Sequence, residues 1–287
     1  MQSIAPSELW LDTGIEDPQA ERLYRAKYLA DGVRGFDAIT DAEIASFHDT
    51  GFLVVNEAFT PEEVQAALDG MMDLIDGVYP EFHGIQFEAK AKDLLPTMSP
   101  EQKQDVVRKL MSFVEYDSRM KAMSAHPALL SVISRMMGET PEIFQDMALI
   151  KPPLIGREKP WHQDIAFFAL PGSATVVGVW IALDEALIVN GCMHVIAGSH
   201  LAGPIPHFQR RDWQICDSDV SEDVVAVPLK PGGCLFFHGL IHHGTPPSHS
   251  SLRRRAVQFH YKPASVAYTS EEERLALFGS EGKDVTC

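Results

Sequence analysis

The chain has 287 residues, of which 45% are hydrophobic and 22% are charged, a composition typical of a globular protein with a buried core. Lys and Arg together number 24 against 40 Asp and Glu, so the formal net charge is −16. A charge of this sign repels phosphate backbones and anionic membrane surfaces, which argues against nucleic acid and membranes as partners.

The first residues, MQSIAPSELWLDTGIEDPQ, contain neither the basic segment nor the apolar run of a signal peptide. No later stretch approaches the roughly 20 apolar residues of a membrane span. The four cysteines, Cys192, Cys216, Cys234 and Cys287, form no CxxC pair, so we expect free thiols in a reducing compartment. These features predict a cytoplasmic protein and leave the oligomeric state open.

Helix-start patterns dominate the first half of the chain. Capping boxes are predicted at TDAE (40–43), TPEE (60–63) and SPEQ (99–102), the last two with Pro at the first helical position. The segment HPALLSVISRMMG predicts a further helix that begins at about residue 127 and ends at a glycine. We therefore expect residues from about 1 to 140 to be mainly helical.

From Phe144 onward the pattern changes to short apolar or alternating runs separated by Pro and Gly, which predict β-strands. Many short strands at this spacing indicate a sandwich or barrel such as a jelly roll. TSEEERLALFG near the end predicts one more capped helix. No repeat or linker divides the chain, so residues 1–287 are expected to form one domain, with the jelly-roll core at about 141–262 and a helix and tail at 263–287.

The segment PWHQDIAFF (160–168) places His162 and Asp164 two residues apart within an apolar run. On a strand these two side chains would point to the same face. The pair is either part of a metal site or a buried ion pair. Iron that must bind oxygen is commonly held by two His and one carboxylate, and HGLIHHGT (238–245) offers three histidines as the third ligand.

Three consecutive arginines, Arg253, Arg254 and Arg255, open a later apolar run. A guanidinium can hold a carboxylate through two hydrogen bonds, so one of them could anchor the far end of a dicarboxylate cosubstrate.

Four segments taken together carry a family resemblance: FHDTGFLVVNEAFTPEEV (47–64), HQD (162–164), NGCMHVIAGSH (190–200) and GGCLFFHGLIHHGTPPSHSSLRRRA (232–256). They resemble the phytanoyl-CoA dioxygenase family of Fe(II)- and 2-oxoglutarate-dependent oxygenases over about residues 40 to 262. The motif of the family has an arginine eleven positions after the histidine of a His-Gly-Ser/Thr sequence. By this resemblance His243 is preferred to His242, and Arg254 is preferred to Arg253 and Arg255.

The resemblance implies an α+β fold with a mainly β core, in which the helical N-terminal half packs on a double-stranded β-helix (jelly-roll, cupin-like) barrel. It implies three metal ligands: His162, Asp164 and His243. It also implies five residues around the cosubstrate: Arg254, Thr245, Trp180, Met147 and Lys109. Thr245 stands where the family usually has Ser, and it keeps the hydroxyl donor.

The activity implied is hydroxylation of an unactivated C–H bond of a small organic metabolite, with Fe(II), 2-oxoglutarate and O2 as cofactors and with release of succinate and CO2. No catalytic residue beyond the metal ligands is implied. A carboxylate at Asp164 argues against the halogenase variant of the fold, which has a small residue there. A zinc-dependent hydrolase or a non-catalytic 2-oxoglutarate-binding protein on the same barrel are the alternatives.

Overall fold

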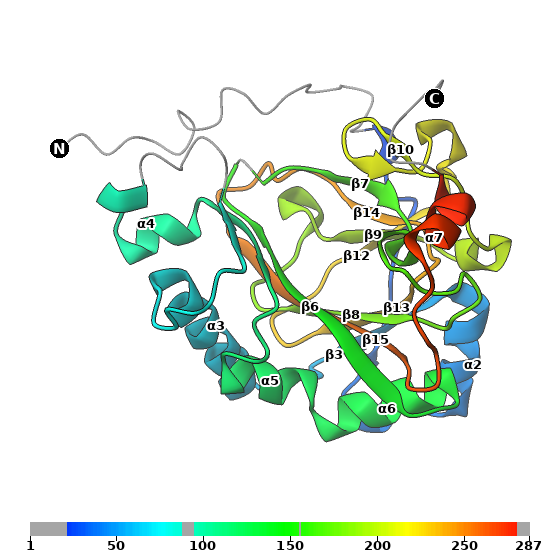
Figure 1. The fold of residues 1–287 in the computed structure, drawn as a ribbon, viewed down its shortest axis with the longest axis horizontal. Coiled ribbons are helices and arrows are strands. Elements are labelled where there is room, and N and C mark those ends of the chain that lie inside the picture. The colour runs from blue at the N-terminus through cyan, green and yellow to red at the C-terminus, as the bar shows by residue number, and fades with distance from the viewer. Residues whose placement is uncertain (1–21, 88–94, 155, 280–287) are drawn as a thin grey trace.

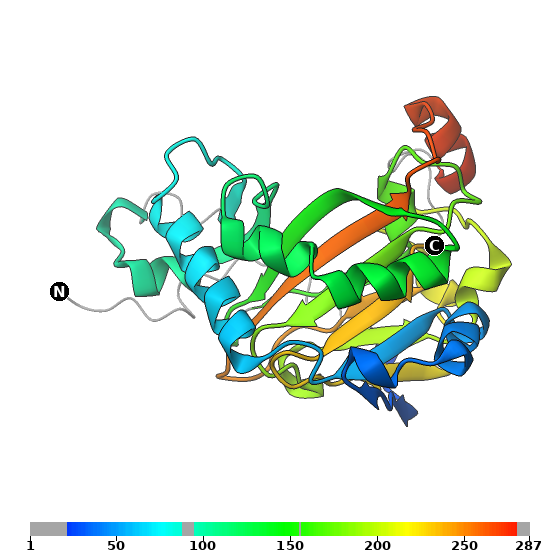
Figure 2. The same cartoon turned by 90° about the horizontal axis from the view of Figure 1, so that it is seen from below.

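The computed structural model describes residues 22–87, 95–154 and 156–279 of the chain. Two β-sheets face each other, one of eight strands and one of five (Figure 1). Figure 2 shows helices running along the outer face of the larger sheet. The predicted C-terminal tail and the first 21 residues lie outside the described residues.

The predicted helix starts are confirmed, because capping boxes form at Thr40, Thr60, Ser99 and Ser270, and the helix after His126 ends at Gly138 as expected. The described α-helices are α2 (Asp41–Thr50), α3 (Pro61–Asp76), α4 (Pro100–Gln104), α5 (Ser118–Ser124), α6 (Pro127–Met137) and α7 (Glu271–Phe278). The described 3₁₀ helices are η2 (Phe36–Ala38), η4 (Leu95–Thr97), η5 (Asp164–Phe167), η6 (Ile188–Asn190), η7 (Ser199–Ala202) and η8 (Asp217–Asp219).

The large sheet has its outer face covered by helices. In spatial order its strands are β2 (Val33–Arg34), β3 (Phe52–Asn56), β13 (Cys234–His238), β8 (Val177–Ala182), β15 (Arg254–Pro263), β6 (Pro141–Lys151), β5 (Val107–Met111) and β4 (Ile85–Phe87). Side chains of α3, α5 and α6, among them Met71, Met123 and Ile133, form one core with Val179 and Phe236 of its outer face. The helices thereby shield that face from water.

The small sheet covers the inner face of the large one. Its strands, in spatial order, are β1 (Tyr28–Leu29), β12 (Val224–Val227), β9 (Met193–Ile196), β14 (His243–Thr245) and β7 (Lys159–His162). A separate hairpin pairs β10 (Phe208–Gln209) with β11 (Trp213–Gln214). Trp180, Leu235 and Phe237 pack against Val195 and Ala226 in a second core between the sheets. Neighbouring residues of one strand thus pack into different cores, because successive side chains of a strand point to opposite faces.

The prediction of a mixed, mainly β protein is confirmed, and two finer expectations are not. In the described part of the first 140 residues, β2 to β5 join the large sheet and β1 joins the small one, so strands stand among the expected helices and a helical half packed on the barrel is not confirmed. FLVV at 52–55 forms a strand that pairs with β13 through the backbone, and its apolar side chains are largely buried there. No described hydrogen-bonded ladder joins the two sheets, so the barrel is not closed.

The structure bears on the cysteines and on membrane-spanning helices. Cys192 and Cys234 are free and buried, as expected. Cys216 is disulfide-bonded, so the expectation of a free thiol is wrong there; disulfide pairing cannot be deduced from the sequence alone. Among the described residues, no helix is both long enough and apolar enough to cross a membrane.

Candidate active site

His162, Asp164 and His243 come together in the structure. His162 ends β7 and lies opposite His243, which begins β14. The Nε2 atom of His162 lies 3.1 Å from Oδ1 of Asp164, and the Nε2 atom of His243 lies 3.5 Å from the same oxygen. All three residues are buried, and one ligand atom from each lies within 4.8 Å of the others. Such a group can hold one metal ion.

Asp164 reaches this group from a position that the sequence did not predict. It is the first residue of η5, so it does not lie on the strand with His162. The backbone is still extended at Gln163, between the two, and the side chains of His162 and Asp164 therefore remain on one side. The chain turns just afterwards, at the start of η5, and Asp164 is therefore placed just beyond the end of β7.

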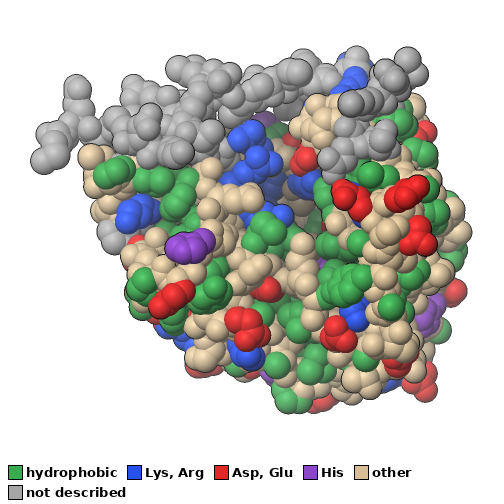
Figure 3. Space-filling view, in the orientation of Figure 1, with side chains coloured by type: hydrophobic (Ala, Val, Ile, Leu, Met, Phe, Trp, Pro, Cys, Tyr) green, Lys and Arg blue, Asp and Glu red, His purple; other side chains and the backbone are tan. Residues whose placement is uncertain are grey.

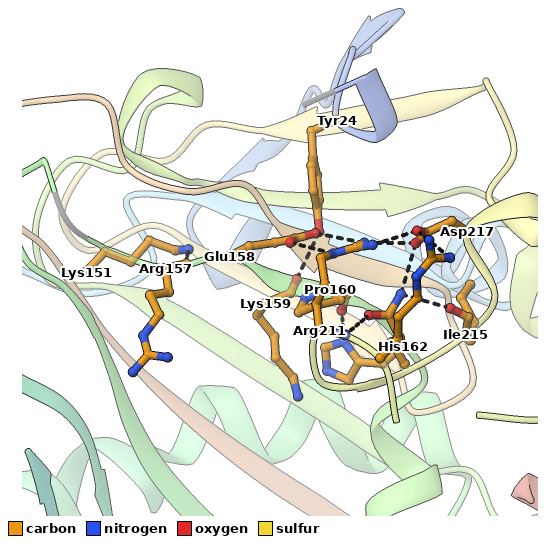
Figure 4. Close-up of polar contacts among 12 residues, drawn as sticks. Tyr24, Lys151, Arg157, Glu158, Lys159, Pro160, His162, Arg211, Ile215 and Asp217 are labelled. Atoms are coloured by element: carbon orange, nitrogen blue, oxygen red, sulfur yellow. Dashed lines mark hydrogen bonds and ion pairs between the residues drawn. The ribbon is translucent and has the colours of Figure 1, made fainter. Parts of the chain in front are cut away.

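The two imidazole rings are oriented by hydrogen bonds on their outer sides. Nδ1–H of His162 donates to the Pro160 carbonyl at 2.8 Å (Figure 4), and Nδ1–H of His243 donates to the Ile241 carbonyl at 3.1 Å. These bonds leave both Nε2 lone pairs directed toward Asp164. Burial, reinforced by the neighbouring His243, lowers the pKa of His162, so its ring stays neutral and able to bind a metal.

The second oxygen of Asp164 is held by two residues of β15. His260 Nε2 lies 2.7 Å from Oδ2, and Gln258 Nε2 donates to the same oxygen at 3.0 Å. Burial raises the pKa of a carboxyl, but the electrostatic and hydrogen-bond contacts of Asp164 with His243, His260 and His162 outweigh this effect, and its pKa lies well below its usual value. A supporting role for His260 was expected from the sequence, whereas sequence reasoning missed Gln258. Their polar side chains on alternate positions of an apolar strand were the available signal.

A cavity of about 370 Å³ opens beside the three residues. Four of the five predicted cosubstrate residues line it: Lys109, Met147, Thr245 and Arg254. Trp180 is fully buried behind the lining. Six Lys or Arg residues but three Asp or Glu residues line the cavity, in a chain that is acidic overall. Figure 3 shows this hollow, with blue basic side chains gathered in it.

Arg254 is a buried cation without an anionic partner among the described residues. It is 2% exposed, and its Nε has no hydrogen-bond partner. One guanidinium N–H donates to the Leu149 carbonyl at 3.4 Å, and the guanidinium lies 5.4 Å from the centre of the Trp180 ring. Burial lowers the pKa of Arg254 to about 10, which leaves it charged at neutral pH. A buried charge in this state favours the binding of an anion.

The remaining predicted residues lie on three different strands. Thr245 ends β14 and is 7% exposed, and Met147 lies on β6 opposite Gln258. Lys109 lies on β5 and is half-buried. Burial, followed by the charge of Lys159, lowers the pKa of Lys109, although Asp164 acts in the opposite direction. Lys109 therefore lies within electrostatic reach of both Lys159 and Asp164.

A buried polar network fixes the start of β7. Glu158 accepts hydrogen bonds from the Tyr24 hydroxyl and from Arg211 Nε, each at 2.9 Å (Figure 4). Arg211 also donates to Asp217 at 2.6 Å and 2.8 Å. Lys159 pairs with Asp212 at 2.8 Å. Because these contacts tie the strand to the loop around β11, they hold His162 in register.

Comparison with known proteins agrees with this geometry. The family model of phytanoyl-CoA dioxygenase (PhyH) matches residues 47–256. A phytanoyl-CoA dioxygenase domain-containing protein 1 from Danio rerio is 27% identical over 277 residues, which cover 83% of this chain and 95% of the relative. A phytanoyl-CoA dioxygenase from Arabidopsis thaliana is 26% identical over 267 residues, with 80% and 90% coverage.

Solved structures share the fold. The non-haem α-ketoglutarate-dependent carbocyclase SnoK of nogalamycin biosynthesis has a TM-score of 0.65 at 19% identity, covering 90% of this chain and 97% of that one. EvdO2 from Micromonospora carbonacea var. aurantiaca, complexed with 2-oxoglutarate, has a TM-score of 0.64 at 21% identity, covering 84% and 97%.

The class of protein follows from these observations together: the chain is an enzyme, a dioxygenase that depends on Fe(II) and 2-oxoglutarate. More particularly, it belongs to the phytanoyl-CoA dioxygenase (PhyH) family, whose model spans most of its length.

Proposed function

We propose that the enzyme hydroxylates an unactivated C–H bond of a small organic metabolite, with iron bound by His162, Asp164 and His243. The observation that carries this proposal is the buried cluster of two imidazole Nε2 atoms and one carboxylate oxygen. This ligand set suits Fe(II) and leaves coordination positions open. When bound, iron with 2-oxoglutarate and O2 supplies the oxidation of the C–H bond and releases succinate and CO2.

In this proposal Arg254 and Thr245 hold the distal carboxylate of 2-oxoglutarate. The guanidinium has unused donors and faces a cavity, and the Trp180 ring beside it restricts its orientation. The Thr245 hydroxyl adds a neutral donor from β14 of the facing sheet. Met147 would contact the carbon chain of the cosubstrate, and Lys109 would add positive charge near its other carboxylate.

The substrate would enter beside Phe167. This ring is 40% exposed, lines the cavity and meets His162 edge-on at 5.6 Å between ring centres. Lys159 lies over the same ring at 4.6 Å and is held by Asp212. The cavity of about 370 Å³ has room for the cosubstrate and part of a small substrate. Phe167 would keep water from one side of the metal.

The fold that we propose is a double-stranded β-helix within a single domain of residues 1–287. The strands from β6 to β9 alternate between the two sheets, and so do the strands from β12 to β15, which supports this topology. The zinc hydrolase alternative is less favoured, because hydrolysis has no use for the buried, unpaired Arg254 on the same cavity.

The test is turnover of the Fe(II)-loaded enzyme with a panel of small metabolites under isotopically labelled dioxygen. The proposal predicts that one class of compounds raises succinate release and that the product gains one labelled oxygen atom. Arg254→Met should need about 10-fold or more additional 2-oxoglutarate, because a charge-assisted hydrogen bond pair is lost. Product formation without label or without succinate would overturn hydroxylation as the reaction.

A further inference from the structure

We infer that Lys151 is a second cation for the distal carboxylate of 2-oxoglutarate and thereby helps the enzyme select a 2-oxo diacid. The inference rests on the proposed function and names a residue that neither the motifs nor the proposed site includes. Lys151 ends β6, and Arg254 begins β15 directly opposite it. Residues opposite each other in an antiparallel pair project to the same face of the sheet, here toward the cavity that both line.

Lys151 and Arg254 are two buried cations that have no ion-pair partner in the described part of the chain. Lys151 is 3% exposed and Arg254 is 2% exposed. Among the residues that the structure describes, neither makes an ion pair. Burial, followed by the charge of Arg254, lowers the pKa of Lys151 well below its usual value, so an anion beside the two residues would favour the charged form of the lysine. A carboxylate placed between them would relieve the burial penalty of both.

The position of the Lys151 ammonium fits this role. Nζ donates to the Pro246 carbonyl at 2.7 Å and to the Arg157 carbonyl, and Figure 4 shows Lys151 beside Arg157. Pro246 directly follows Thr245, so the ammonium lies at the same end of the cavity as the proposed hydroxyl donor. An ammonium has three donors. Two donate to these carbonyls, and the third remains for an anion.

The side chain of Lys151 passes over Gly191. A Cβ at position 191 would lie 2.6 Å from Cδ of Lys151 and 2.7 Å from the Pro246 carbonyl oxygen. The glycine therefore leaves the space that the lysine needs to extend under the Thr245–Pro246 segment. This close packing fixes the ammonium near Arg254 and Thr245.

A purely structural brace is the competing explanation, because Lys151 also ties two loops together through its carbonyl contacts. The two roles differ in one respect. A brace affects every 2-oxo acid alike, whereas a carboxylate ligand affects only acids with a distal carboxylate. 2-Oxopentanoate separates them, because it keeps the metal-chelating end of 2-oxoglutarate and carries a methyl group in place of the distal carboxylate.

The experiment titrates Fe(II)-loaded protein without oxygen with each of the two acids, and follows both the visible band of the chelate at about 500 nm and the thermal midpoint. Lys151→Met should raise the Kd for 2-oxoglutarate about 10-fold or more and leave that for 2-oxopentanoate within about twofold. Lys151→Gln, which can still donate to a carbonyl but has no charge, should behave alike and decides the matter if Lys151→Met does not fold.

Lys262→Met is the matched control. Lys262 is also buried, lies on β15, pairs with Glu142 at 3.1 Å and is not among the residues that line the cavity. This variant should keep the preference of the wild type for the diacid. Equal weakening of both acids by Lys151→Met, or no change in either, would overturn the inference and leave the proposed function standing. A wild-type protein that binds neither acid would overturn both.

Discussion

Hydrogen bonds on the outer side of each proposed ligand decide which of its atoms faces the metal position. The backbone carbonyls of Pro160 and Ile241 fix the two imidazoles, and Gln258 with His260 fixes the carboxylate. A carboxylate held in this way at Oδ2 presents Oδ1 to the two Nε2 atoms. Such supporting contacts commonly change metal affinity about 10- to 100-fold when they are removed.

His260→Phe tests this support. The ring of His260 is surrounded by Phe144, Phe168 and Phe237, so a phenyl group fits the space while the 2.7 Å bond to Asp164 is lost. We expect Fe(II) affinity to fall about 10-fold or more, with a thermal midpoint close to that of the wild type. Metal titration by competition with a chelator measures the affinity. An unchanged affinity would show that Asp164 does not need this contact.

The metal-ligand and anchor candidates were predictable from the sequence, whereas most of the residues that support them were not. His162, Asp164, His243 and Arg254 occur in short motifs with defined spacing. Lys151, by contrast, becomes significant only because β6 pairs with β15 in a register that places it opposite Arg254. Register between strands far apart in the sequence depends on the packing of the whole sheet, which no local pattern encodes.

At the level of elements, Gln163 ties the end of β7 to two loops. Its Nε2 donates to the carbonyls of Gly203 at 2.9 Å and Leu240 at 2.8 Å, and its Oε1 accepts from the Ile205 N–H at 3.0 Å. The residue stands between His162 and Asp164 in the sequence, and its side chain is fully buried. It therefore fixes the turn from β7 into η5.

Gln163→Leu should destabilise the protein, because three backbone groups lose their partner at about 1–3 kcal/mol for each one left buried and unsatisfied. We expect a clear fall in the thermal midpoint together with weaker metal binding. Gln65→Leu, on the exposed face of α3, removes a bond to Asp69 only and should leave both properties unchanged. Equal stability of the two variants would refute the tethering role of Gln163.

The sequence revealed where helices begin better than it revealed which strands pair with each other. The capping boxes at Thr40 and Ser270 are local hydrogen-bond patterns, so the sequence located those helices. The strands β4 and β5 lie between helices and are stabilised by pairing with each other and with β6. Short strands of this kind carry little local signal, and the first half was therefore predicted to be more helical than it is.

For the whole molecule, buried histidines couple stability to pH. Burial is the largest cause that lowers the pKa of His194, His238 and His242 to about 4 and that of His207 to about 3. The unfolded chain binds protons below its histidine pKa of about 6.5, while the native protein does not. Stability is therefore retained above that pH and decreases as the pH falls toward 4.

We expect the free energy of unfolding to decrease between pH 6.5 and 4 by up to about 1.4 kcal/mol per pH unit for each of these histidines. Denaturant titration of the metal-free protein at a series of pH values measures the slope. His238→Asn, which can still accept the hydrogen bond from the Leu240 N–H, should reduce the slope. A stability that is constant from pH 7.5 to 5 would contradict the prediction.

The central claim is that His162, Asp164 and His243 bind iron and that Arg254 anchors 2-oxoglutarate beside it. The most direct measurement is a titration without oxygen with Fe(II) and 2-oxoglutarate, followed through the visible band at about 500 nm that an iron-chelated 2-oxo acid gives. We predict a band in the wild type, no band in His162→Ala, and in Arg254→Met a band that requires about 10-fold or more additional 2-oxoglutarate. Absence of the band in wild-type protein that is fully loaded with iron would contradict the assignment.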